Sequence, residues 1–136
     1  VVTLSQRVSG LVEEWRKWSY ALAEAATGPM QDSSPDPFWV GVEKERTLCK
    51  YEVTGDREVL AVPADDFPDE GGQVELTRLT VQGNEWWTVG FEAWGKEIPM
   101  QENLHLVVKH VLADSEPPVF DVEDSYSYPK WLALVS

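Results

Sequence analysis

The chain is poor in cysteine and has no long hydrophobic run. Because Cys49 is the only cysteine, no disulfide can form within the chain, which favours a reducing compartment. No stretch approaches the roughly 20 apolar residues that cross a bilayer. No basic start precedes an apolar segment, as it would in a retained secretory signal. We therefore expect a cytoplasmic protein without a membrane partner.

Basic residues are also scarce. The sequence has 11 Lys and Arg against 24 Asp and Glu, which gives a net charge of −13. Nucleic acids and anionic membranes are polyanions that bind clusters of basic side chains, so this charge predicts that neither is a partner. It permits a protein partner with a basic surface. Solubility is an equally simple reason for the excess of acids.

The motifs of the common metal and phosphate sites are missing. Neither G-x-x-x-x-G-K-[ST] nor G-x-G-x-x-G nor H-E-x-x-H occurs. His105 and His110 are five residues apart, which places them roughly 140° apart around a helix rather than on one face. The acidic stretch from Asp65 to Glu70 lacks the calcium-loop spacing. The sequence predicts no metal site and no cofactor.

The composition is otherwise that of an ordinary globular protein. Apolar residues make up 43% of the 136 positions and include seven tryptophans, enough for a core without disulfides or metals. The length fits one domain of common size. We expect a single domain over residues 1–136.

A helical pattern covers residues 4–26. Apolar residues recur at steps of three and four, and Gly28-Pro29 supplies a stop signal. The stripe consists of Leu4, Val8, Leu11, Trp15, Trp18 and Leu22. A loop is predicted for residues 28–37, which are rich in Pro, Ser and Asp.

Strand patterns follow. Residues 38–53 are strand-like, but the apolar face switches along them, which predicts a bulge at residues 45–47 or two strands. Residues 58–62 suggest a short returning strand, and 63–72 a loop. Residues 73–81 and 85–94 predict a hairpin around Gly83-Asn84.

The pattern becomes helical again at residues 100–113. Residues 131–135 are apolar and are predicted either to add a final strand or to pack on the core. Strands separated by turns, with a helix near each end, indicate an α+β fold. The expected architecture is an antiparallel sheet of about four to six strands with both helices on it.

Alternating charges mark one strand as a candidate site. Glu43 and Glu45 share one face, and Lys44 and Arg46 the other. Two carboxylates at this spacing can bind a divalent cation or act as an acid–base pair if they are buried.

Two residues of the later hairpin, Arg78 and Glu92, are candidates to join this polar face. The E-x-E-R run is similar to the first strand of triphosphate-tunnel enzymes, in which alternating glutamates precede a lysine. Thr47 stands at the position of that lysine, and such a tunnel would need more basic residues than this chain has. The other interpretation is a charged, solvent-facing edge strand, on which alternating charges discourage aggregation.

Aromatic residues mark a second candidate. Trp86 and Trp94 share one face of the predicted strand 85–94, and Trp87 and Phe91 share the other. One face has to meet the core, and the other is available to a helix, a ligand or a partner protein. A Trp86/Trp94 platform is the strongest indication of a binding surface in the sequence.

Two functions of different class remain. The first is a non-catalytic binding or protein-interaction module that uses the acidic surface and the Trp86/Trp94 face. The alternative is a small metal-dependent hydrolase of a phosphate-containing substrate. In that enzyme Glu43, Glu45 and Glu92 would hold the metal, and Arg78 would contact the anion.

Overall fold

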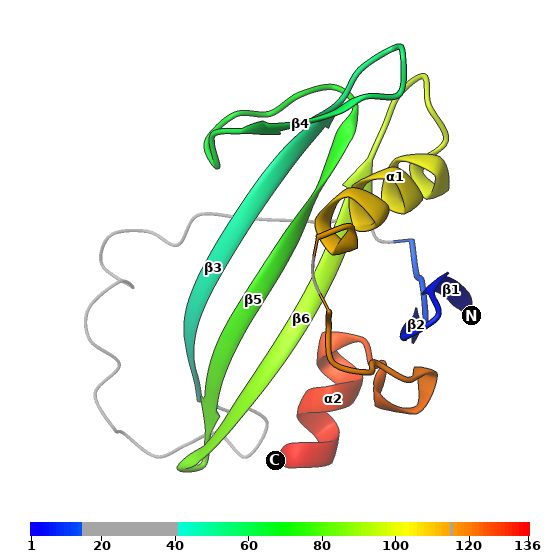
Figure 1. The fold of residues 1–136 in the computed structure, drawn as a ribbon. Coiled ribbons are helices and arrows are strands. Elements are labelled where there is room, and N and C mark those ends of the chain that lie inside the picture. Colours follow the sequence, from blue (N-terminus) through cyan, green and yellow to red (C-terminus); the bar gives the residue numbers. More distant parts are fainter. Residues whose placement is uncertain (15–40, 115) are drawn as a thin grey trace, which may run out of the picture.

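A computed structural model describes residues 1–14, 41–114 and 116–136 (Figure 1). Four strands form an antiparallel sheet in the order β4-β3-β5-β6. The strands are β3 (Val42–Val53), β4 (Val59–Val62), β5 (Gly71–Val81) and β6 (Asn84–Trp94). A separate two-stranded sheet is made by β1 (Val2–Ser5) and β2 (Val8–Gly10). The α+β class is therefore confirmed, and the described residues contain six strands in two sheets.

The predicted central hairpin is present. β5 and β6 pair without interruption from Gly71↔Trp94 to Val81↔Asn84. Gln82 and Gly83 form the turn, one residue earlier than predicted, with φ values of 49° and 80°. Two consecutive residues with positive φ are typical of a type I′ turn, whose twist matches that of the flanking strands.

The predicted bulge in the first long strand is wrong. β3 is one continuous strand, in unbroken register with β5 from Val42↔Val81 to Glu52↔Gly71. The apolar face switches because opposite faces of the sheet are covered at its two ends. Val53, at one end of β3, is buried in a cluster with Ile98 and Val107, whereas Val42 points to the opposite face.

Helix α1 (Met100–Leu112) confirms the predicted second helix. It packs mainly against β6 and β5 (Figure 1). Its Val107 is fully buried and lies in one cluster with Val53 of β3. Gly72 permits this close approach, since a Cβ there would lie 3.1 Å from Val107 Cγ2. We call the side of the sheet that contains Val53 and Gly72 the α1 face.

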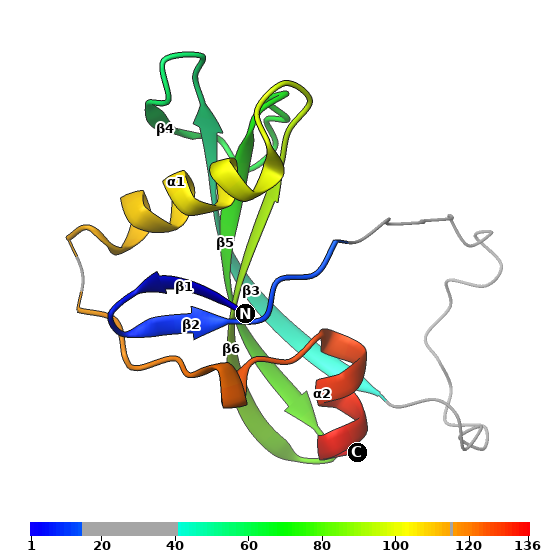
Figure 2. The same ribbon diagram turned by 90° about the vertical axis from the view of Figure 1, so that its right-hand side faces the viewer.

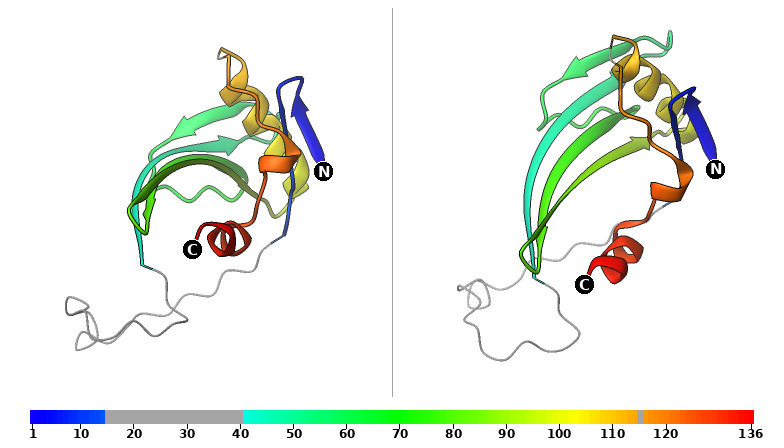
Figure 3. Two further views of the ribbon diagram at one scale, coloured as in Figure 1. Left: turned by 90° about the horizontal axis from the view of Figure 1, so that it is seen from below. Right: turned by 60° about the horizontal axis from the view of Figure 1, so that its bottom comes forward.

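The described chain ends in a helix that packs on the sheet, so of the two alternatives predicted for residues 131–135 the final strand is wrong. Helix α2 (Tyr128–Val135) has Pro129 in its first turn, where the fixed φ of proline suits a helix. Trp131 packs edge-on against Trp86 of β6 at 6.0 Å between ring centroids, and Lys44 lies over the Tyr128 ring. Trp86 and Lys44 belong to the side of the sheet opposite to the α1 face, which we call the α2 face. Figure 2 shows the two helices on opposite sides of the sheet, and the long strands curve over α2 in Figure 3.

The predicted N-terminal helix is wrong where it can be compared. Residues 2–10 form the β1–β2 hairpin, and residues 15–26, with the loop 28–37, lie outside the described residues. Tertiary pairing overrides the helical spacing here. Backbone hydrogen bonds join Ser9 N–H to Phe120 O and Phe120 N–H to Arg7 O, each at 2.9 Å, and Val8 is buried.

A polar junction fixes the α1 end of the sheet. The Glu70 carboxylate accepts hydrogen bonds from the backbone N–H groups of Lys96, Glu97 and Ile98 and from Asn103 Nδ2. The bond from Glu97 contributes most to lowering the pKa of Glu70 to about 2. Elsewhere, a short 3-10 helix, η2 (Val122–Asp124), precedes α2. Among the described residues no helix is long and apolar enough to span a membrane.

Candidate functional site

The α1 face carries uncovered apolar residues beyond the reach of helix α1. Leu76 of β5 is opposite Val89 of β6. Two residues closer to the hairpin turn, Arg78 of β5 is opposite Trp87 of β6. Leu76 is 42% exposed, Trp87 61% and Val89 38%. We call these three residues the Trp87 patch. Leu76 is paired with Val89 and diagonal to Trp87, and side chains at such positions on adjacent strands are close enough to form one continuous patch.

Acidic residues border the Trp87 patch toward the hairpin tip. Arg78 Nη2 lies 2.6 Å from Glu45 Oε2, and Arg78 Nη1 lies 3.6 Å from Glu85 Oε2. Glu43 is on the same face, opposite Thr80. One guanidinium therefore stands among three exposed carboxylates, and the border is acidic overall.

The structure brings together some of the sequence-predicted residues. Glu43 and Glu45 share the α1 face, as the alternation predicted, and the candidate Arg78 lies on the same face opposite Glu45. Glu92 is opposite Gln73 on the α2 face, so it does not join them. Glu43 and Glu45 are exposed, and residues 42–49 of β3 have no pairing with β4, as expected of a charged edge. No cluster of His, Cys, Asp or Glu within the described parts of the chain could hold a metal.

The tryptophan platform is divided. Trp86 and Trp94 lie on the α2 face, as predicted, but at opposite ends of β6. Trp86 packs against Trp131. The half-buried Trp94 donates its indole N–H to Pro68 O at 2.7 Å.

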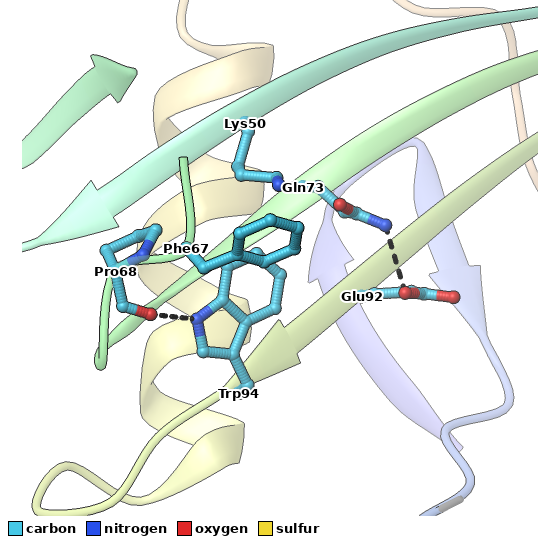
Figure 4. Close-up of a pocket in the computed structure, with 6 residues that line it drawn as sticks. All are labelled: Lys50, Phe67, Pro68, Gln73, Glu92 and Trp94. Carbon is cyan, nitrogen blue, oxygen red and sulfur yellow. Dashed lines mark hydrogen bonds between the residues drawn. The ribbon is translucent and has the colours of Figure 1, made fainter. Parts of the chain in front are cut away.

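A hollow of about 340 Å³ opens beside Trp94 on the α2 face (Figure 4). Its apolar walls are Phe67, Pro68 and Trp94, and its polar lining is Lys50, Gln73 and Glu92. We call it the Lys50 hollow.

The polar lining of the hollow is one row across three strands. Lys50 of β3 is opposite Gln73 of β5, which is opposite Glu92 of β6. Gln73 Nε2 donates to Glu92 Oε2 at 3.0 Å. The residue Lys50 is only 4% exposed, and its Nζ donates to Asp66 O at 2.7 Å and lies 4.0 Å from the centre of the Phe67 ring. The row thus presents an ammonium, an amide and a carboxylate in order.

Sequence reasoning missed several of these residues. Alternation placed Trp87 on the strand face opposite to Trp86 and gave it no functional role. Periodicity shows which side chains share a face, but it does not show which face of the sheet is covered. No signal for Lys50 was present in the sequence, because alternation places it on the face opposite to the apolar Cys49 and Tyr51. Phe67, the lone aromatic of an acidic loop, was the signal for the wall of the hollow.

Comparison with known proteins adds no relative: no family model, curated protein or solved structure matches the chain.

Proposed function

We propose that the protein is a non-catalytic protein-interaction module that binds its partner through the Trp87 patch. The observation that carries this proposal is the 61% exposure of Trp87 beside Leu76 and Val89 on one face of a regular sheet. A continuous exposed apolar patch with a polar border is typical of a protein-binding surface. Tryptophan is also the side chain most enriched among residues that dominate binding energy.

Charge indicates the kind of partner. The acidic border formed by Glu43, Glu45 and Glu85 complements a basic segment. A second copy of the chain would bring two acidic borders together, and a net charge of −13 opposes such a contact. The same charge disfavours nucleic acid and anionic membrane. We therefore propose a partner segment that combines large apolar side chains with Lys or Arg.

The hydrolase alternative draws no comparable support from the described residues. Glu92 is on the face opposite to Glu43 and Glu45. Arg78, which would contact the anion, is engaged by Glu45 at 2.6 Å.

Selection from a random linear peptide library tests the proposal. The wild-type protein is the bait, and peptides that also bind Trp87→Ser are subtracted. We expect the enriched peptides to combine basic and large apolar residues, and their affinity to fall at least roughly tenfold with Trp87→Ser, as for a central aromatic contact.

Phe67→Ser is the matched control, because Phe67 is also an exposed aromatic (86%) but lies at the Lys50 hollow. It should leave the affinity of the peptides unchanged. Enrichment of acidic peptides, or an equal loss with both variants, would contradict the proposal.

A further inference from the structure

Among the described residues, no strand pairs with the outer edge of β3 over residues 42–49. β4 pairs only with residues 50–53, at one end of β3 (Figure 1). Residues 43–47 are all exposed. Unpaired N–H and C=O groups at the edge of a sheet are a template for pairing with another chain. This edge is therefore a candidate site for an added strand.

One hydrogen bond shows which backbone groups of β3 point outward. Val53 N–H donates to Glu70 O at 3.0 Å, on the β5 side of the strand. Because backbone groups alternate in direction along an antiparallel strand, the odd-numbered residues of β3 bond to β5. The N–H and C=O groups of the even-numbered residues point away from β5. Beyond the reach of β4 these residues are Val42, Lys44, Arg46 and Leu48.

The edge lacks the common protections against pairing. Natural edge strands are often short, bulged, interrupted by proline or covered by long side chains. β3 has 12 residues, no proline and no irregularity in its register with β5. Its charged side chains lean inward, since Glu45 and Arg46 form ion pairs with residues of β5 and Lys44 lies over the Tyr128 ring. These contacts draw the side chains over the faces of the sheet and leave its outer edge open.

The alternating charges of β3 decide which strand this edge can accept. A two-fold contact that joined two copies edge to edge would keep the same face of both sheets on one side. Glu45 would then be opposite Glu45 or Glu43 of the second copy, and like charges directly opposite are destabilising. The edge therefore opposes pairing with itself and favours a strand with the complementary alternation.

We infer that the outer edge of β3 binds an extended segment of a partner protein in which Lys or Arg alternates with Asp or Glu. The basic side chains lie beside Glu43 and Glu45 on the α1 face, and the acidic ones beside Lys44 and Arg46 on the α2 face. Main-chain hydrogen bonds give the affinity, and the charge pairs give the specificity. Such a segment carries little net charge, so the net charge of −13 does not repel it. The inference is independent of the proposed function, because it uses main-chain groups of the edge and not the Trp87 patch.

Amide hydrogen exchange tests the inference, with the peptide VTEKEKV, blocked at both ends, as the probe. Its lysines share one face of an extended strand and its glutamates the other. We expect a saturating concentration to slow exchange of the Lys44, Arg46 and Leu48 amides at least roughly tenfold, because these N–H groups gain acceptors. The peptide VTEEKKV has the same composition without the alternation. It should bind roughly fivefold more weakly, since like charges meet in part of the pairing.

Two variants separate the main-chain contribution from the charge. Arg46→Pro removes an outward N–H group and should fold, because an edge strand tolerates proline where the N–H faces solvent. It should weaken the binding of VTEKEKV at least roughly tenfold, since the ring also obstructs the added strand. Arg46→Gln keeps the N–H group and should weaken binding about fivefold at most. If Arg46→Pro fails to fold, the exchange measurement on the wild-type protein still decides.

The inference is overturned if VTEKEKV does not bind saturably, if it binds without slowing exchange at these amides, or if the two peptides bind equally. Equal binding to Arg46→Pro and Arg46→Gln also overturns it. Slow exchange of the same amides in the free protein would overturn it as well: relief on dilution would identify a second copy as the occupant, and no dependence on concentration would identify the chain itself. The peptides and both variants leave the Trp87 patch intact, so failure here does not count against the proposed function.

Discussion

The two helices cover opposite faces of the sheet at opposite ends, and the two areas that they leave uncovered are unlike. Next to α1 on its own face lies the Trp87 patch, which is apolar with an acidic border. On the α2 face, toward the other end of the sheet, lies the Lys50 hollow with its row of ammonium, amide and carboxylate. The first area resembles half of a protein interface, and the second has the polar groups of a small-molecule site.

The comparison also separates residues that fold the chain from residues that are available for contact. Leu76 and Leu79 are three positions apart on β5 and point to opposite faces. Leu79 is 1% exposed and Leu76 is 42% exposed. Two leucines of one strand therefore have different roles, which substitution can measure.

The largest expected effect is on Leu79. Leu79→Ala should lower the free energy of unfolding by about 2–5 kcal/mol, as for other buried leucines. Leu76→Ala should lower it by less than about 1 kcal/mol, because little apolar area is lost from the core. Urea unfolding followed by circular dichroism measures both. Equal losses would mean that the Trp87 patch is covered in the folded protein, and would contradict the proposed function.

The next effect concerns the polar junction at Glu70. Because the folded-state pKa is about 2, below the usual 4.5, the ionised carboxylate stabilises the folded state at pH values above about 4.5. That stabilisation is lost as the pH falls from about 4.5 to about 2.

Glu70→Gln should therefore be less stable than wild type at pH 7, with a difference that shrinks on acidification through this window. Parallel urea titrations at several pH values measure the difference. Glu58→Gln, whose side chain is exposed on the nearby turn, is the control and should show no such trend. A difference that is independent of pH would show that the charge of Glu70 is not the cause.

Local patterns predicted the elements whose partners are adjacent in sequence. The β5–β6 hairpin follows from alternation on both sides of a short turn, and α1 from its apolar spacing. The predicted turn was one residue too late because Gln82 has a positive φ, which is uncommon for a residue other than glycine and is not expected from the sequence.

Elements that depend on distant partners were missed. Residues 2–10 have helical spacing, but Phe120, more than a hundred positions away, pairs with them as a strand would. The final residues form a helix whose aromatic side chains pack on the α2 face of the sheet. Trp131 contacts Trp86, and Tyr128 contacts Lys44. For the candidate site, alternation predicted which side chains share a face, whereas which face is covered depends on where the helices pack.

The smallest effect is expected at Arg78, on the acidic border of the Trp87 patch. Its ion pair with Glu45 joins side chains that are 46% and 72% exposed, so Arg78→Gln should cost at most about 1 kcal/mol of stability. The same change makes the border more acidic. We expect it to strengthen the binding of the selected basic peptides a few-fold at low salt, and the gain to shrink as salt screens the charges. Titrations at two salt concentrations measure this, with Glu45→Gln expected to act in the opposite direction. Weaker binding with Arg78→Gln would mean that the partner presents an acid to this border, and the proposed basic partner would be wrong.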